Sequence, residues 1–262
     1  MKGEGAVRLL HTSDLHLGAE HGVKGPAWHG TACLCPLLSV AQLARDEECD
    51  LLIIAGDLFD NNRVALELVV RAFEILESLP MLSLIIPGNH DAYDETSVYQ
   101  RASVNGGEGR LHVVRRSEGE LIEFDSLSLS VWARPVIRHD FSNRPLSTAP
   151  PHPGRGWYVV VGHGEFVGDA SNTWRPRSSP ISALEINQTG ADYIALGHWD
   201  ATTAVGGDPA RAWYSGAPHG GGEHQHALSV TLDVETGLVV EQVPTQPAGR
   251  SVGGPLIGLC SG

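Results

Sequence analysis

LLIIAGD, residues 51–57, is the stretch that decides the fold, because an unbroken apolar run stops there on a glycine and a carboxylate. Continuous aliphatic runs of this kind predict strands that are buried on both faces of a sheet. The pattern recurs along the chain, and each time the run ends on residues that carry an oxygen or imidazole donor. The other runs are Val7–Leu10, Leu84–Ile86, Trp157–Val161 and Tyr193–Leu196.

The donors after these runs are far apart in the sequence, but the predicted sheet gathers them. In an open α/β sheet, ligands bind beyond the carboxyl ends of the strands, so we expect these side chains at one edge. Glycine directly precedes the donor in four clusters and lets the backbone turn sharply close to a ligand. One Gly-Asp pair alone is ordinary turn chemistry; the repetition favours a site. The donors are Asp14, His16, Asp57, Asn89, His163 and His198, followed by Asp200.

The donor chemistry predicts a metal centre. Carboxylate, imidazole and amide oxygen suit hard or borderline divalent ions, namely Mn, Fe, Mg or Zn. Seven donors are too many for one tetrahedral zinc and fit two ions that share a bridging carboxylate. Two such ions can hold a hydroxide between them and clamp the attacking and leaving oxygens of a phosphoryl centre. The sequence therefore predicts a two-metal phosphoester hydrolase.

Phosphoester hydrolysis also needs an acid that protonates the departing alkoxide. His90 directly follows the amide donor Asn89, and imidazole suits proton transfer near neutral pH. Asp91 can orient His90 or keep it protonated through a charge-assisted hydrogen bond. We therefore predict His90 and Asp91 as the catalytic residues.

These motifs resemble, in order and spacing, those of the calcineurin-like metallophosphoesterases. They are most similar to the SbcD/Mre11 DNA-repair exonuclease branch in the stretches HTSDLHLG, AGDLFD, IPGNHD, LGHW and the later YSGAP. The resemblance spans Asp14 to about Pro218. It implies an α/β fold, a sandwich of two mixed β-sheets flanked by helices, with a cap domain that is reduced or absent.

The resemblance also implies a role for each donor. Asp14, His16 and Asp57 would bind one ion, Asp57 would bridge to a second ion held also by Asn89, His163 and His198, and His90 would be the general acid. Family members usually read Gly-His-x-His at the last motif, where this chain has Asp200. Aspartate is still a hard-metal ligand and favours manganese or magnesium over zinc. The alternative is that Asp200 only caps a turn.

The net charge of the chain bears on which substrates it can bind. The formal net charge is −13 at pH 7, whereas surfaces that track DNA are normally basic. We predict a nucleic acid or nucleotide substrate, with Arg175, Arg177, His219 and His224 as candidate contacts; the alternative is that these residues lie in exposed surface loops. One alternative is a small-molecule phosphodiesterase or phosphatase, for example for cyclic nucleotides. Another is a non-catalytic scaffold that binds proteins.

Residues 1–243 are predicted to form the metallophosphoesterase domain and residues 244–262 a flexible tail, because Gly, Pro and Ser dominate there. No apolar stretch reaches the ~18–20 residues of a membrane span, and no leader-like segment precedes the first strand. We therefore expect a cytoplasmic protein without membrane contact. The resemblance further implies an SbcC-like ATPase partner. The Cys33-x-Cys35 pair is predicted to be reduced.

Further elements follow from periodicity and turn signals. Helices are predicted at Leu37–Glu48, Val64–Ser78 and Ser182–Gln188, and further strands at Leu111–Val114, Leu121–Phe124, Leu127–Ala133, His226–Leu232 and Leu238–Val243.

Overall fold

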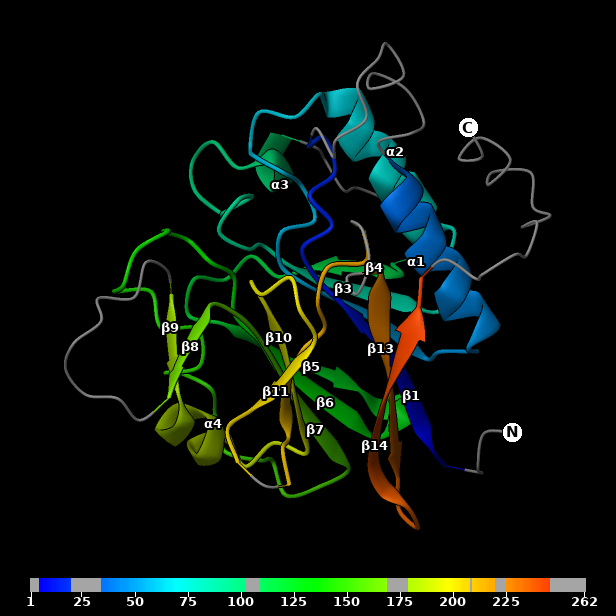
Figure 1. Ribbon diagram of the computed structural model, residues 1–262, viewed down its shortest axis with the longest axis vertical. Helices are drawn as coiled ribbons and strands as arrows, with labels where there is room; N and C mark the ends of the chain where they lie inside the picture. The colour runs from blue at the N-terminus through cyan, green and yellow to red at the C-terminus, as the bar shows by residue number, and fades with distance from the viewer. Residues whose placement is uncertain are drawn as a thin grey trace.

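The computed structural model describes residues 5–19, 34–101, 109–168, 179–207, 209–219 and 225–245. Two six-stranded sheets pack face to face, and helices cover their outer faces. In Figure 1, helices α1 and α2 lie on one side of the molecule and α4 on the other, with the strands between them. The predicted sandwich of two mixed sheets with flanking helices is therefore confirmed.

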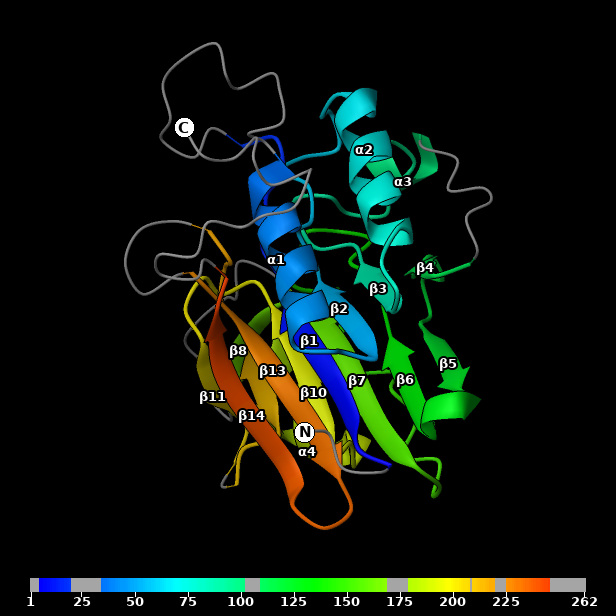
Figure 2. The ribbon, with the colours of Figure 1, turned by 90° about the vertical axis from the view of Figure 1, so that its right-hand side faces the viewer.

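The first sheet has the strand order β14-β13-β1-β2-β3-β4. Its strands β1 to β4 are parallel, while β13 is antiparallel to β1 and forms a hairpin with β14. Figure 2 shows this hairpin beside β1. The strands are β1 (Val7–Thr12), β2 (Leu51–Ala55), β3 (Leu82–Ile86), β4 (Leu111–Val113), β13 (His226–Asp233) and β14 (Gly237–Pro244).

The second sheet has the order β11-β12-β10-β7-β6-β5. Its four central strands are parallel, and antiparallel strands form both edges. The strands are β5 (Glu120–Phe124), β6 (Leu129–Ala133), β7 (Trp157–His163), β10 (Tyr193–Gly197), β11 (Thr203–Val205) and β12 (Ala212–Tyr214). A separate pair consists of β8 (Glu165–Gly168) and β9 (Pro180–Ser182).

The predicted helices are present, with boundaries shifted by one or two residues. They are α1 (Cys35–Asp46), α2 (Leu66–Glu77) and α4 (Ala183–Thr189); the short helix α3 (Val98–Arg101) lies between β3 and β4. Helix α4 begins with a capping box between Ser182 and Glu185 and ends at Gly190, whose φ is +61°. Glycine adopts this left-handed conformation without a Cβ penalty, as helix ends require.

Alternating side chains divide the apolar residues of the first sheet between two cores. The faces of β1 and β2 that meet the second sheet carry Leu9, Leu51 and Ile53. The opposite faces pack against α1 and α2 with Leu10, Leu52 and Ile54. A third core joins α4 to the outer face of the second sheet. Burial on both faces is why these strands read as continuous apolar runs.

A buried polar contact links the two sheets through strands β1 and β10. His11 of β1 has Nδ1 2.7 Å from the hydroxyl oxygen of Tyr193 on β10, and both side chains are fully buried. Burial lowers the pKa of His11 to about 3, so the ring is neutral. His11 is therefore a core residue that contributes packing and a cross-sheet hydrogen bond.

Several details differ from the prediction. The four short strands β8, β9, β11 and β12 were not predicted, since three or four residues carry little periodicity. Strand β6 begins at Leu129, because residues 125–127 form a 3₁₀ turn that ends on Ser128 with positive φ. Cys35 is disulfide-bonded rather than reduced, a pairing that sequence spacing does not reveal. The predicted tail beyond Thr245 lies outside the described residues. Among the described helices, none has the length and hydrophobicity needed to cross a membrane.

Candidate metal centre

Two buried carboxylates lie side by side where the parallel strands β1 and β2 end. Asp14 and Asp57 are 2% and 1% exposed. The loops that carry them are tied together, because the Asp14 N–H donates to the Gly56 carbonyl and the His16 N–H to the Asp57 carbonyl, each at 3.0 Å. In-register parallel strands thus bring together two like charges from residues far apart in sequence.

Each carboxylate is fixed by a backbone amide through one oxygen. Asp14 Oδ2 accepts from the His198 N–H at 3.0 Å, and Asp57 Oδ1 accepts from the His90 N–H at 2.8 Å. The other oxygens face His16, whose Nε2 lies 3.9 Å from Asp14 Oδ1 and from Asp57 Oδ2. Asp57 Oδ2 also lies 3.4 Å from His163 Nε2. Asp57 Oδ2 therefore stands between two groups of donors.

The second group of donors converges on Asn89. His163 Nδ1 lies 2.9 Å from the Ala55 carbonyl oxygen, so it carries the hydrogen of that bond. His163 Nε2 in turn lies 2.8 Å from Asn89 Oδ1, and His198 Nδ1 lies 2.8 Å from the same oxygen. A neutral His163 would direct a lone pair at oxygen acceptors. A proton on His163 or a bound cation satisfies these oxygen atoms, and the donor set suits a divalent ion.

The electrostatics identify where the proton is held in the absence of a cation. Burial raises the pKa of Asp14 to about 6. Burial alone would lower the pKa of His163, but the charges of Asp57 and Asp14 raise it to about 9. Burial would also raise the pKa of Asp57, yet the charge of His163 holds it well below its usual value. His163 thus neutralises part of this charge, and a bound cation would replace its proton.

The remaining two imidazoles are in the form that binds metals. Burial lowers the pKa of His16. Burial, followed by the charge of His163, lowers the pKa of His198 to about 4. Both rings are therefore neutral near pH 7, the protonation state in which imidazole binds metals.

Backbone strain is concentrated at the same residues. Six described non-glycine residues have positive φ, and four of them are Asp14, His16, Asp57 and His198. Such conformations cost about 1–3 kcal/mol each and cluster at functional sites. Adjacent glycines make room for the donors: a Cβ at Gly56 would lie 2.1 Å from His163 Nδ1, and one at Gly88 would lie 2.1 Å from Asp57 Oδ1.

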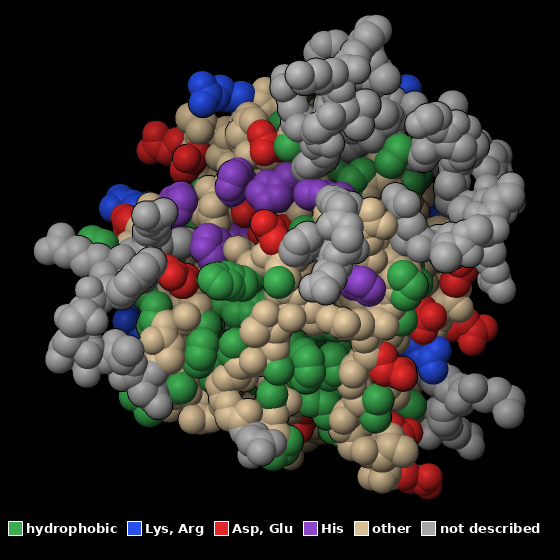
Figure 3. Space-filling view, viewed as in Figure 1, with side chains coloured by type: hydrophobic (Ala, Val, Ile, Leu, Met, Phe, Trp, Pro, Cys, Tyr) green, Lys and Arg blue, Asp and Glu red, His purple; other side chains and the backbone are tan. Residues whose placement is uncertain are grey.

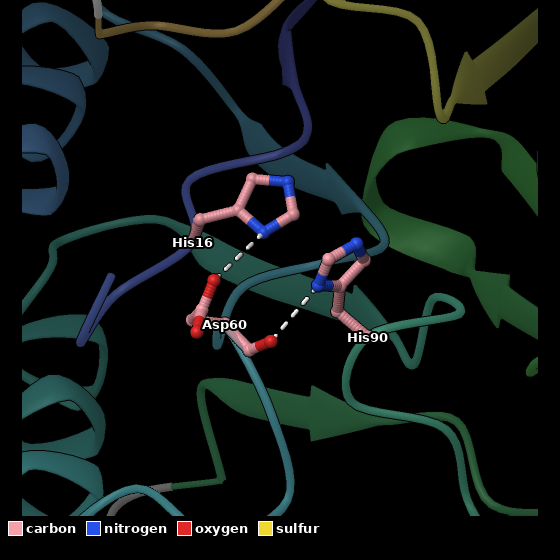
Figure 4. Close-up of side chains that lie close together, drawn as sticks. All are labelled: His16, Asp60 and His90. Carbon is pink, nitrogen blue, oxygen red and sulfur yellow. Dashed lines mark hydrogen bonds and ion pairs between the residues drawn. The ribbon is translucent and has the colours of Figure 1, made fainter. Parts of the chain in front are cut away.

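His90 is exposed at the edge of the centre, and Asp60 holds its ring (Figure 4). The Nδ1 of His90 donates to the Asp60 backbone carbonyl at 2.9 Å, which leaves Nε2 free to face a substrate. The Asp60 carboxylate lies 3.9 Å from His16 Nδ1, on the opposite side of that ring from Asp14 and Asp57. Sequence reasoning missed Asp60, although it is the second carboxylate of the AGDLFD motif.

Asp91 does not orient His90 as the sequence suggested. Its buried carboxylate accepts hydrogen bonds from the Phe59 N–H (3.0 Å), the Gly88 N–H (2.7 Å) and the Tyr99 hydroxyl (2.6 Å). These donors use both carboxylate oxygens to fasten the loop after β3. Asp91 thus fixes the backbone that carries Asn89 and His90, while the ring orientation of His90 comes from Asp60.

The other predicted residues have separate positions. Asp200 is exposed. Burial lowers the pKa of His16, and the negative charge of Asp200 acts in the opposite direction and raises it. His219 Nε2 donates to the Asp14 carbonyl at 2.9 Å, so this ring supports the Asp14 loop. The predicted substrate contacts Arg175, Arg177 and His224 lie outside the described residues.

A cleft of about 1200 Å³ opens beside His90 and Asn89. Its walls include Tyr93, Arg115 and the segment Ile137–His139, which follows β6. On this face of the molecule, several histidine side chains lie together in a patch (Figure 3). The Ile137–His139 segment carries no motif of its own. The cleft is large enough for a ligand well beyond a single phosphate group.

Comparison with known proteins identifies a family and several relatives. Residues 7–200 match the family model for calcineurin-like phosphoesterases. The chain is 27% identical over 135 residues to a probable cyclic nucleotide phosphodiesterase of Psychrobacter arcticus, covering 47% of this chain and 48% of that protein. It is 26% identical over 210 residues to the DNA double-strand break repair protein Mre11 of Aeropyrum pernix, covering 74% of this chain and 49% of that one. The chain thus spans about half the length of these two relatives.

The SbcD subunit of the nuclease SbcCD from Bacillus subtilis is 27% identical over 298 residues, covering 96% of this chain and 71% of that protein. Among solved structures, TT1561 of Thermus thermophilus superimposes with a TM-score of 0.56 at 12% identity, over 92% of this chain and 100% of that one. GAP50, the anchor in the inner membrane complex of Plasmodium, gives a TM-score of 0.54 at 11% identity, over 95% and 87%. These structural likenesses show the fold alone.

Metal binding should strengthen as the pH rises. A cation requires His163 Nε2 without its proton and Asp14 ionised, and their pKa values in the cation-free protein are about 9 and about 6. The apparent dissociation constant for Mn²⁺ should therefore fall between pH 6 and 8, by about tenfold per pH unit for each displaced proton. Calorimetry in two buffers of different ionisation enthalpy measures the protons released. The same proton release should persist in the control variant His112→Gln, which changes an exposed histidine of β4. A metal affinity that does not depend on pH, with no proton release, would contradict the assignment of His163 and Asp14 as ligands.

Proposed function

The chain belongs to the calcineurin-like phosphoesterase family, and on that premise we propose that it is a two-metal phosphodiesterase of the SbcD/Mre11-like type that acts on nucleic acid or a nucleotide fragment. Family membership makes it a metal-dependent phosphoester hydrolase. One observation carries the finer proposal: Asp57 Oδ2 faces the donors of two neighbouring groups while His90 stands beside them. This is the arrangement that two-metal hydrolysis requires.

The donors divide into two ligand sets. Asp14, His16 and Asp57 would hold one ion, and Asp57, Asn89, His163 and His198 would hold the other. When bound, the two ions polarise the phosphoryl group and activate water. We favour manganese, because the sets combine carboxylate and amide oxygen with imidazole, and the exposed carboxylate of Asp200 would add another hard ligand.

His90 supplies the proton for the leaving group. Its Nδ1 is occupied by the Asp60 carbonyl, so the proton must leave from Nε2. The hydrogen bond between its own N–H and Asp57 Oδ1 ties the position of His90 to that of the bridging carboxylate. This bond keeps the distance between His90 and the bridging carboxylate fixed, so the general acid stays aligned with the phosphoryl group that the ions would hold.

The cleft beside His90 favours a diester over a small monoester. Arg115, Arg138 and Tyr93 are among the residues that line it. Guanidinium groups bind phosphate oxygens through paired N–H donors. These groups match the phosphates and the flat base of a nucleotide.

A small cyclic nucleotide is the second candidate substrate. The net charge of −13 opposes binding of a long polyanion by this chain alone, and acidic Asp94 and Glu95 also line the cleft. The similarity to a probable cyclic nucleotide phosphodiesterase favours the same class. A purely structural role is disfavoured, because a scaffold has no use for buried, strained carboxylates. An SbcC-like ATPase partner remains a prediction from the resemblance.

Replacing the general acid should affect poor leaving groups most. The His90→Asn protein should keep its metal content but lose about 10²–10⁴-fold in rate on thymidylyl-thymidine, whose alkoxide leaving group needs a proton. The loss should be much smaller on bis(p-nitrophenyl) phosphate, because nitrophenolate leaves without protonation. Steady-state rates with Mn²⁺ measure both values, with His112→Asn as the control.

Two results would count against this account. Equal losses on the two diesters would remove His90 from the role of general acid. A wild-type protein that hydrolyses neither diester with Mn²⁺, Fe²⁺, Mg²⁺ or Zn²⁺ would refute the phosphodiesterase assignment itself.

Asp200 should set the metal preference of the first ion site. The Asp200→His protein should remain active and shift its preference toward Zn²⁺, since imidazole is a softer ligand than carboxylate. The Asp200→Ala protein should bind one ion more weakly and the other unchanged. Metal titration followed by elemental analysis measures both effects. Wild-type metal affinity and preference in Asp200→Ala would identify the residue as a turn former only.

A further inference from the structure

Trp199 presents a large aromatic surface at the rim of the metal centre. Its side chain is 48% exposed. The preceding residue, His198, contacts Asn89, and the charge of the following residue, Asp200, reaches His16. Because consecutive Cα atoms are about 3.8 Å apart, the backbone of Trp199 lies directly beside the candidate ligands. In Figure 3, hydrophobic side chains adjoin the histidine patch on this face.

The indole is held in place by a buried partner. The rings of Trp199 and Tyr214 have centroids 6.4 Å apart and are tilted by 43°. The Tyr214 hydroxyl donates to the Gly164 carbonyl at 2.7 Å and accepts from the Phe166 N–H at 2.8 Å. These bonds connect the aromatic pair to the segment that directly follows His163. Trp199 therefore packs against one buried ring beside the candidate ligands, and about half of it is exposed to solvent.

Side chains of types that can bind phosphate lie near His198. Burial and the charge of His163 are the main causes that lower the pKa of His198, and the charge of His139 lowers it further. His139 therefore lies close enough to His198 to interact with it electrostatically. Both His139 and its neighbour Arg138 line the cleft. A nucleotide combines a charged phosphate with a flat, weakly hydrated base, and these surroundings offer a partner for each part.

We propose that Trp199 stacks on an exposed nucleobase face of the substrate and so selects phosphodiesters that carry such a base. The inference rests on the proposed function and extends it to a substrate class. Inside a duplex both faces of a base are covered by its neighbours, so only a terminal, single-stranded or free nucleotide can offer a face to the indole. Stacking depends on the π-face and tolerates any base, which predicts weak discrimination between sequences.

Two diesters with the same leaving group test this role. Thymidine 5′-(p-nitrophenyl phosphate) carries a base, whereas methyl p-nitrophenyl phosphate does not. The Trp199→Ala protein should lose about 5- to 100-fold in kcat/KM on the nucleoside ester, the range expected for one stacked base. The loss should appear mainly in KM, since stacking stabilises the bound substrate and the transition state alike. The rate on the methyl ester should stay within about twofold.

Matched variants complete the experiment. Trp199→Phe should recover part of the loss, because it keeps an aromatic face. Val234→Ala should leave both rates unchanged; it trims a side chain that is 81% exposed in the β13–β14 turn, at the far end of the sheet from the site. Equal losses on both esters in Trp199→Ala, or no loss on either, would overturn the stacking role while leaving the phosphodiesterase assignment intact. Hydrolysis of neither ester by the wild-type protein would instead overturn the proposed function.

Discussion

The position of the Asp57 carboxylate is the constraint on which the rest of the site depends. Its backbone leaves β2 with a φ of +54°, and its side chain is 1% exposed. One oxygen is occupied by the His90 N–H, while the other lies between His16 and His163. A buried carboxylate costs free energy unless a positive charge compensates it. In the cation-free protein that compensation comes from protonated His163, and the proposed ions would supply it in the active enzyme.

Much of the fold and the position of the centre followed from the sequence for a simple physical reason. Strands buried on both faces must be apolar throughout, so the point where each run ends marks the edge of the sheet. The donors after β1, β2, β3, β7 and β10 therefore could be located without knowing the pairing of the strands. Short strands such as β8 and β11 were missed, because they are too brief for a periodic signal and depend on neighbours for their hydrogen bonds.

The details of the site were less accessible, because they depend on the direction in which side chains point. Asp91 follows His90 in sequence, but its carboxylate turns to the Phe59 and Gly88 amides, and the Asp60 carbonyl holds the His90 ring instead. No sequence pattern encodes a backbone carbonyl as a partner. The Ile137–His139 segment enters the cleft only through the packing of the loop after β6. The ends of the strands thus allow the candidate ligands to be predicted from the sequence, whereas the substrate contacts depend on loop packing and become visible only in the structure.

The central claim is that two ions share Asp57, and anomalous diffraction from crystals grown with Mn²⁺ tests it most directly. The account predicts two anomalous peaks roughly 3.5–4 Å apart, with Asp57 Oδ2 bound to both. Asp14 and His16 should complete the site of one peak, and Asn89, His163 and His198 that of the other. A single peak, or two peaks that do not share Asp57, would contradict the account.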